Sequence, residues 1–241
     1  MEEKPKNNPI LLLDMYGVII KESKGYFIPY TYEHFDTKEH DRLTRAFREE
    51  CLFTKAGNGE ISSDEFLSRL GYPNPQEALE DYLTHYLTLD PDFIRFAECH
   101  YREYDFVLLS NDVKEWSKYL FSLYKLQKFF KDTIVSGEIH MRKPEARIFT
   151  HTLEHLQCQP WDCIFVDNSV RNLNAAQEAG LETVLFNRDH ETYSGNIVSN
   201  FQELGILLKE HAETVSDTAS RPPEQAAEEM IKLYTAEVLK S

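Results

Sequence analysis

The stretch "ILLLDMYGVII", residues 10–20, decides the fold class. Its first four residues, Ile10 to Leu13, form an apolar run that is too short for a helix and is typical of a buried strand. Asp14 ends the run, and Gly17 permits a turn before the next apolar residues. A carboxylate at the end of a buried strand is costly unless a partner offsets its desolvation. Asp14 is therefore the first candidate functional residue.

Further short apolar runs along the chain predict more buried strands, at Phe106–Leu109, Cys163–Val166, Thr183–Phe186 and, more weakly, Thr133–Val135. Between them lie segments with helical spacing, at 112–126, 143–156 and 169–180. Ser110 and Asn111 are placed to cap the first of these helices, and Pro144 suits the first turn of the second. Strands that alternate with helices indicate parallel pairing with right-handed crossovers. The prediction is an α/β fold whose core is a doubly wound parallel sheet, Rossmann-like in its arrangement.

The segment between the first two strands, residues 21–105, is far longer than the roughly twelve residues that a crossover requires. It reads as helical, so we predict an inserted α-helical cap above the carboxyl edge of the sheet, where such sheets bind ligands. The core then comprises residues 1–20 and 106–210. The stretch 211–229 is polar and low in aromatic residues. For residues 211–241 we predict a flexible linker followed by a C-terminal amphipathic helix, a candidate homo-oligomer contact.

Charge and cysteine content narrow the functional classes. The net charge of −15 disfavours nucleic acid and anionic membranes as partners. The N-terminus does not read as a signal peptide, and no run approaches the roughly 18 apolar residues of a membrane span. Four cysteines without a CxxC pair favour free thiols in a reducing, cytoplasmic environment over a zinc site.

Polar residues follow the predicted strands in a recurring way: Asp14, then Ser110 and Asn111, then Lys143, then Asp167 and Asn168. Each alone has an ordinary structural explanation, such as a helix cap or a surface lysine. The carboxyl ends of parallel strands meet at one crevice, so we expect these side chains to converge. Carboxylates suit a hard cation such as Mg²⁺, and an ammonium with helix N-termini suits a phosphoryl group. The set predicts a site for a small phosphorylated metabolite and a divalent metal.

Four stretches, "LLLDMYGVI", "FVLLSND", "KPE" and "FVDNSVRNLNAAQEAG", resemble the four motifs of the haloacid dehalogenase-like hydrolase superfamily, in the same order. The resemblance covers about residues 9–208, and residues 21–105 stand where that superfamily carries its helical cap. In motif style, "MRKPEARIF" and "GEISSDEF" are similar to bacterial sugar-phosphate phosphatases that act on α-glucose 1-phosphate.

The resemblance implies a Mg²⁺-dependent phosphatase. Asp14 would be the nucleophile and would form an aspartyl-phosphate that water hydrolyses. Ser110 and Asn111 would bind the phosphoryl oxygens, and Lys143 would bridge the nucleophile and the phosphate. The implied metal ligands are Asp14, the Tyr16 carbonyl, Asp167 and Asn168.

Two positions depart from the superfamily pattern. Tyr16 stands where phosphatases usually place a second Asp, and loss of a positioned acid/base typically costs about 10²–10⁴-fold in rate. Asn168 replaces a usual acidic ligand. Three hypotheses follow. The first is a phosphatase for substrates whose leaving group needs little protonation. The second is a metal-independent 2-haloacid dehalogenase that uses Asp14 as nucleophile, because true dehalogenases carry an Asp-x-Tyr-Gly motif, and the third is an impaired protein that binds a phosphorylated ligand or docks a partner.

Overall fold

The computed structural model describes residues 8–23 and 26–219. The chain forms two compact units, with the boundary between Asn200 and Phe201. Within the described residues of the first unit, six strands pair in parallel in the order β3-β2-β1-β4-β5-β6. Their bounds are β1 Ile10–Leu13, β2 Asp105–Ser110, β3 Phe130–Val135, β4 Cys163–Asp167, β5 Glu182–Phe186 and β6 Asn196–Val198. The predicted doubly wound sheet is confirmed, whereas β6 was missed because its three residues include a polar one.

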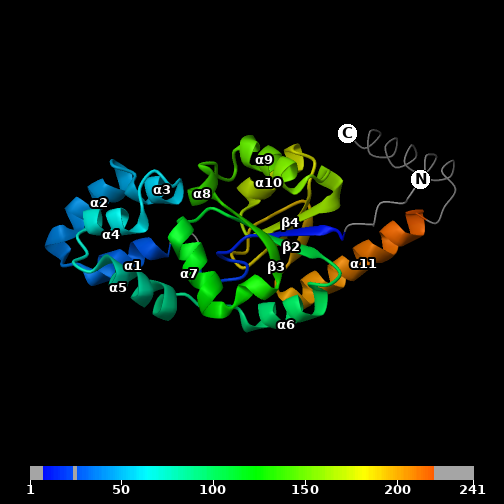
Figure 1. The fold of residues 1–241 in the computed structure, drawn as a ribbon, viewed down its shortest axis with the longest axis horizontal. Coiled ribbons are helices and arrows are strands. Elements are labelled where there is room, and N and C mark those ends of the chain that lie inside the picture. The colour runs from blue at the N-terminus through cyan, green and yellow to red at the C-terminus, as the bar shows by residue number, and fades with distance from the viewer. Residues whose placement is uncertain (1–7, 24–25, 220–241) are drawn as a thin grey trace. The chain divides into compact units, whose positions relative to one another are not determined.

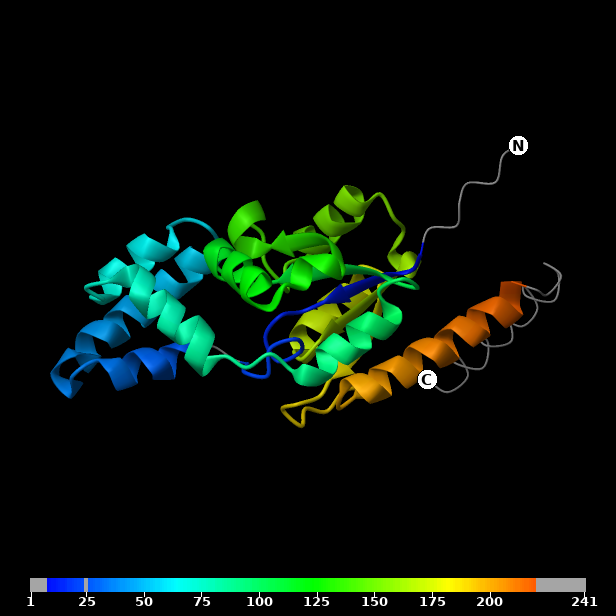
Figure 2. The ribbon, with the colours of Figure 1, turned by 60° about the horizontal axis from the view of Figure 1, so that its bottom comes forward.

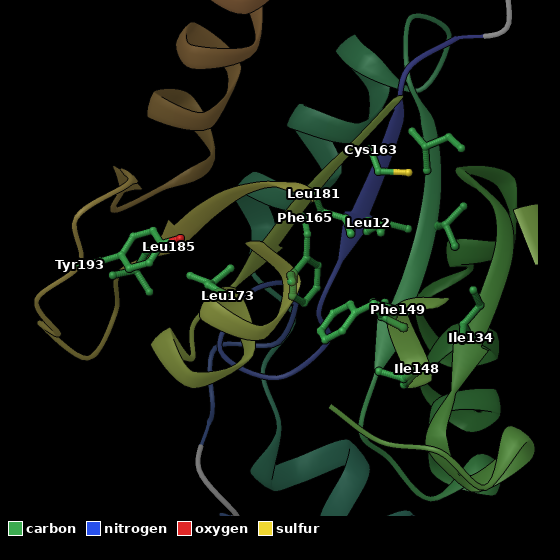
Figure 3. Close-up of a cluster of buried hydrophobic side chains, with 14 residues drawn as sticks. Leu12, Ile134, Ile148, Phe149, Cys163, Phe165, Leu173, Leu181, Leu185 and Tyr193 are labelled. Carbon is green, nitrogen blue, oxygen red and sulfur yellow. The ribbon is translucent and has the colours of Figure 1, made fainter. Parts of the chain in front are cut away.

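Helices cover both faces of this sheet (Figure 1). On one face, α9 (Ala146–Leu156) and α10 (Val170–Glu178) contribute to a buried apolar cluster with alternate residues of β1, β2 and β4. Figure 3 shows Phe149 of α9 beside Phe165 of β4, and their ring centroids lie 5.8 Å apart. On the other face, α7 (Lys114–Tyr124) packs Phe121 against Phe130 of β3, with ring centroids 5.1 Å apart. The period of two along each strand sends successive side chains to opposite faces, so both faces are apolar.

The insert between β1 and β2 is helical, as predicted. Its helices α1 to α5 gather to one side of the sheet in Figure 1, and Figure 2 shows the same arrangement from a second direction. Their bounds are α1 Phe27–His34, η1 Thr37–Glu39, α2 His40–Arg48, α3 Leu52–Gly57, α4 Ser63–Leu70, α5 Pro75–Asp81 and η2 Tyr82–Tyr86.

The last helix of the predicted insert belongs to the sheet layer. Phe96 of α6 (Pro91–His100) stacks on Phe106 of β2 with ring centroids 5.7 Å apart. The chain segments that enter and leave the group of helices α1 to α5 are joined by an antiparallel bridge between Ile20 and Leu89. The cap boundary of 21–105 therefore extended too far, because helical periodicity marks an apolar face without saying which layer it contacts.

The second unit begins with helix α11, Phe201–Ala219, which continues past residue 211. The predicted flexible linker from 211 is wrong over its described part, since polar composition does not prevent a helix already begun from extending. The amphipathic helix predicted beyond it lies outside the described residues. Short elements complete the list: η3 Leu126–Lys128, α8 Ser136–Ile139 and η4 Pro160–Asp162. Among the described residues, no helix has the length and apolar character needed to cross a membrane.

Candidate functional site

The candidate site lies where the strand order reverses. β1 pairs with β2 on one side and with β4 on the other, and the chain runs outward to β3 before it returns to β4. Asp14 follows β1, whereas Ser110 and Asp167 end β2 and β4. Parallel strands place all three at one edge, and the reversal opens a crevice there. The main chain supports this placement, because the Asp14 N–H donates to the Val166 carbonyl at 3.0 Å.

Lys143 is the centre of the site. Its ammonium lies 2.8 Å from Asp14 Oδ1 and 2.7 Å from Asp167 Oδ2, and it donates to the Leu109 carbonyl at 2.7 Å. The lysine is only 2 % exposed, so its charge has little access to water. A buried charge of this kind requires close partners, and two carboxylates with a carbonyl provide them. The structure thus brings together the three ionisable side chains predicted from the strand ends.

Burial and charge shift these groups in opposite directions. Burial raises the pKa of Asp14 to about 6, helped by Asp167 and opposed by Lys143. Burial acts to lower the pKa of Lys143, but its two carboxylate partners outweigh that effect and raise the pKa above its ordinary value. Lys143 therefore remains protonated at neutral pH, and it stabilises the ionised form of Asp14 that a nucleophile requires.

Ser110 and Asn111 do not cap the next helix, which corrects that prediction. The residue that precedes α7 is Val113, which makes no side-chain capping bond. Asn111 instead fixes the lysine segment, since its amide accepts from the Lys143 N–H and donates to the Lys143 carbonyl, both at 2.8 Å. The Ser110 hydroxyl is fully buried and has no hydrogen-bond partner among the described residues. Ser110 ends β2 at the same edge of the sheet as Asp14, but it does not line the cavity. A buried, unpaired hydroxyl at this edge calls for a partner, such as a ligand oxygen.

Asp112 is the residue that sequence reasoning missed. It is 5 % exposed and accepts the Tyr16 hydroxyl at 3.1 Å, the Ser117 hydroxyl at 2.5 Å and the Val113 N–H at 2.8 Å. Burial raises the pKa of Asp112 to about 7, although these hydrogen bonds oppose the shift. Asp112 directly follows Ser110 and Asn111 in "SND", but in the sequence it stands only as the first residue of the helical segment 112–126.

The Tyr16 hydroxyl is committed to Asp112 as a donor. Burial and the nearby carboxylate raise the pKa of Tyr16 well above its ordinary value, so the phenol stays protonated at neutral pH. It therefore cannot activate water as a second aspartate would. The pair of Tyr16 and Asp112 nevertheless brings a carboxyl group to the edge of the same cavity.

The turn after Asp14 is held by residues from the loops after β4 and β5. Gly17 has φ +80°, and a Cβ there would lie 2.3 Å from Asn168 Nδ2, so only glycine fits. Asn168 Nδ2 donates to Asp189 Oδ2 at 3.2 Å. Arg188 donates to the carbonyls of Gly17 and Val18 at 3.0 and 3.1 Å and forms an ion pair with Asp90. The loop after β5 thus fixes both the turn and the amide of Asn168.

The predicted metal ligands divide into two groups. Asp14, Tyr16 and Asn168 line the cavity, and the hydrogen bond to Asp189 occupies the Asn168 nitrogen, which leaves its oxygen available. Asp167 is 0 % exposed and does not line the cavity. Its oxygens accept from Lys143, from Asn172 Nδ2 at 3.0 Å and from the Ser169 N–H at 2.7 Å. The Asp14 carboxylate with the neutral oxygens of Tyr16 and Asn168 fits Mg²⁺, because this ion usually keeps several of its waters. Asp167 acts instead as the partner of Lys143.

A cavity of about 410 Å³ lies between the sheet edge and the helical insert. Its upper wall is aromatic, with Tyr26, Phe53 and Tyr82 from the insert and Trp116 from α7. Trp116 anchors the insert, because its indole donates to Ser63 Oγ at 2.8 Å and its ring lies among the aromatic side chains of the insert. The aromatic residues at the start of the insert thus contribute to its core, through Phe27, and to the cavity, through Tyr26.

The comparisons with curated proteins give short, partial matches. The chain is 28% identical over 87 residues to drimenol cyclase of Aspergillus calidoustus, covering 36% of this chain and 14% of that protein. It is 27% identical over 103 residues to glyceraldehyde 3-phosphate phosphatase of Methanothermobacter thermautotrophicus, covering 39% and 45%. It is 26% identical over 91 residues to a flavin mononucleotide hydrolase of Arabidopsis thaliana, covering 38% and 35%. The chain spans less than half the length of each of these relatives.

Solved structures match over most of the chain. A Bacteroides thetaiotaomicron enzyme, solved with magnesium and inorganic phosphate, superposes with a TM-score of 0.64 at 22% identity, over 78% of this chain and 98% of that one. An L-2-haloacid dehalogenase from Xanthobacter autotrophicus superposes with a TM-score of 0.59 at 15% identity, over 84% and 99%. Likeness at these identities shows a common fold. The family model for haloacid dehalogenase-like hydrolases matches residues 9–180, and the chain belongs to that hydrolase family.

Proposed function

We propose that the protein is a Mg²⁺-dependent phosphatase that hydrolyses a small phosphomonoester, such as a sugar phosphate, through an aspartyl-phosphate. The observation that carries the proposal is the contact of Lys143 with Asp14, both of which line the cavity. A nucleophilic carboxylate and a protonated amine in one cavity, with an unpaired hydroxyl at the same edge of the sheet, match the needs of phosphoryl transfer, which depends on positioning and on charge stabilisation.

The residues divide the reaction between them. An Asp14 oxygen attacks phosphorus, the bond from phosphorus to the leaving oxygen breaks, and the released alkoxide takes a proton from solvent. Ser110 donates its hydroxyl hydrogen to a phosphoryl oxygen, and Lys143 offsets the charge that accumulates between the nucleophile and the phosphate. Water then attacks the phosphorus, which returns the Asp14 carboxylate and releases inorganic phosphate and a proton.

Mg²⁺ in this site would be held by the Asp14 carboxylate, the Asn168 amide oxygen and the Tyr16 main-chain carbonyl. It would offset the negative charge of the phosphoryl oxygens. With one carboxylate among these three ligands, affinity for the ion should be modest. The Tyr16 phenol stays protonated and supplies no ionised base at the usual acid/base position, which favours leaving groups that need little protonation, such as the anomeric oxygen of a sugar 1-phosphate. The aromatic wall offers a surface for the apolar face of a sugar ring.

The test is hydrolysis of an aryl phosphate, whose leaving group is stable as an anion, with Mg²⁺ and with a chelator. Asp14→Asn should abolish turnover, whereas Asp41→Asn, an exposed carboxylate change in α2, should not alter it. Full turnover in Asp14→Asn would refute the assigned nucleophile. Unchanged turnover in the chelator would refute the metal requirement. A panel of phosphorylated metabolites then ranks substrates.

One observation favours a second candidate function, metal-independent displacement of halide from a 2-haloacid by Asp14. Asp14 is the single carboxylate among the predicted metal ligands that lines the cavity, and such a displacement needs neither a metal nor a proton for the leaving group. Halide release from 2-chloropropionate in a chelator, without phosphatase activity, would establish it. Absence of both activities, with phosphate still bound, would instead support the third hypothesis, a ligand-binding protein. The cytoplasmic location stays a prediction.

A further inference from the structure

Two arginines at the cavity have no part in the reaction proposed above. Arg142 directly precedes Lys143, and Arg171 lies in the first turn of α10. Both line the cavity that contains Asp14. Among the residues that the structure describes, neither side chain forms an ion pair or a hydrogen bond. In a chain with a net charge of −15, the cavity lining carries as many basic as acidic side chains, and the two arginines are the basic groups there without a bonded partner among the described residues.

The segments that carry these arginines are fixed to one another. Lys143 Nζ and Asn172 Nδ2 both donate to Asp167 Oδ2, at 2.7 and 3.0 Å. Each arginine is thus adjacent in sequence to a residue bound to the same buried oxygen. The main chains of both arginines are therefore held in place through their neighbours.

The other charges at the cavity are already engaged. Lys143 is balanced by Asp14 and Asp167. In the proposed reaction, that part of the cavity receives the phosphoryl group. Glu22 accepts the Thr88 N–H at 2.7 Å, and Asp112 accepts from two hydroxyls and an N–H as described above. The two guanidinium groups therefore remain for a second anion. Their planar array of donors matches a carboxylate or a phosphate.

We propose that Arg142 and Arg171 form a second anion subsite, so that the preferred substrate is a phosphomonoester with an additional carboxylate or phosphate on its leaving group. The inference rests on the proposed phosphatase function for its kinetic consequence. Binding of the ligand itself is separable from turnover.

Three sugar phosphates provide matched probes: glucose 1-phosphate, glucuronic acid 1-phosphate and glucose 1,6-bisphosphate. They share the phosphate on carbon 1 and the sugar ring, and they differ at carbon 6, which bears a hydroxyl, is oxidised to a carboxylate, or bears a second phosphate. Wild-type kcat/KM should be about tenfold higher or more for at least one of the two doubly anionic probes, and which of them gains identifies the second anion.

Arg142→Gln and Arg171→Gln should each remove most of this preference through KM, while kcat/KM for glucose 1-phosphate changes little. The control is Arg147→Gln, because Arg147 is paired with Glu145 in the same region of sequence but does not line the cavity. Equal losses on all three probes, or a wild type without preference in both kinetics and binding, would overturn the subsite.

Calorimetric titration of the Asp14→Asn variant with the same three compounds keeps the two proposals distinguishable. Tighter binding of a doubly anionic probe, lost in the double variants with Arg142→Gln or Arg171→Gln, supports the subsite even where the wild type shows no phosphatase activity. In that outcome the proposed function fails and the subsite stands. If the wild type hydrolyses the probes but shows no preference in binding, the proposed function stands and the subsite is overturned.

Discussion

Asp112→Asn should make the protein more stable at neutral pH, although it removes a carboxylate that accepts three hydrogen bonds. Burial raises the pKa of Asp112 from an ordinary value of 3.8 to about 7 in the folded protein. Between these pH values the folded state retains a proton that the unfolded chain has released. The stability that this group contributes is therefore complete below about pH 4 and is lost as the pH rises toward 7.

The magnitude follows from the separation of the two pKa values, which lie about three pH units apart. Each unit corresponds to about 1.4 kcal/mol, so ionisation of the buried carboxyl costs the wild type about 4 kcal/mol above pH 7. The asparagine has no such cost. Its oxygen retains the bonds from Tyr16 and Val113, and its amino group faces Ser117, whose hydroxyl can rotate to accept.

The assay is urea-induced unfolding of the wild type and the variant at pH 4.5, 6 and 8, in a chelator, since only the difference between them isolates this group. The difference in unfolding free energy should widen by about 3 kcal/mol across that range in favour of the variant. The control, Asp41→Asn, should show no comparable widening, because Asp41 is exposed and has no bonded partner among the described residues. A wild-type-to-variant difference that is independent of pH would refute the reasoning.

Three other substitutions test the site and its support. Lys143→Met should destabilise the fold by about 3–5 kcal/mol in urea at pH 7, because two buried carboxylates lose their shared cation; an unchanged midpoint would contradict the ion-pair geometry. Gly17→Ala should lower kcat by tenfold or more and reduce stability by over about 1 kcal/mol, since φ is +80° and the methyl meets an amide. Trp116→Ala should cost about 3–5 kcal/mol and expose the insert to limited proteolysis; resistance equal to the wild type would refute its anchoring role.

The titration of Asp112 also bears on the proposed phosphatase function. A carboxyl that is neutral for part of the time at pH 7 would add less repulsion toward a phosphoryl group than an ionised second aspartate would. The Tyr16–Asp112 pair thus retains a carboxyl at the cavity while it limits negative charge there. This arrangement accounts physically for a site in which the usual acid/base position is a tyrosine.

The sequence by itself determined the layered core and the order of its parts. Four apolar residues before Asp14, and similar runs elsewhere, are sufficient to predict the buried strands, because strand length, apolar character and the polar residue at the strand end are local properties. The carboxyl ends of parallel strands must share an edge, so the convergence of Asp14, Ser110 and Asp167 followed from topology. The weak run at 133–135 proved to be the end of a longer strand, β3, whose first half carries alternating exposed residues.

Only the tertiary structure decided how the side chains divide their tasks. Asp112 and Tyr16 are 96 residues apart in sequence, and no local pattern announces their hydrogen bond. Asp167 and Asn168 look interchangeable as ligands along the chain, yet the first binds Lys143 beneath the cavity and the second lines it. A side chain is placed by partners that folding brings from distant segments, whereas sequence periodicity records only which face of its own element is buried.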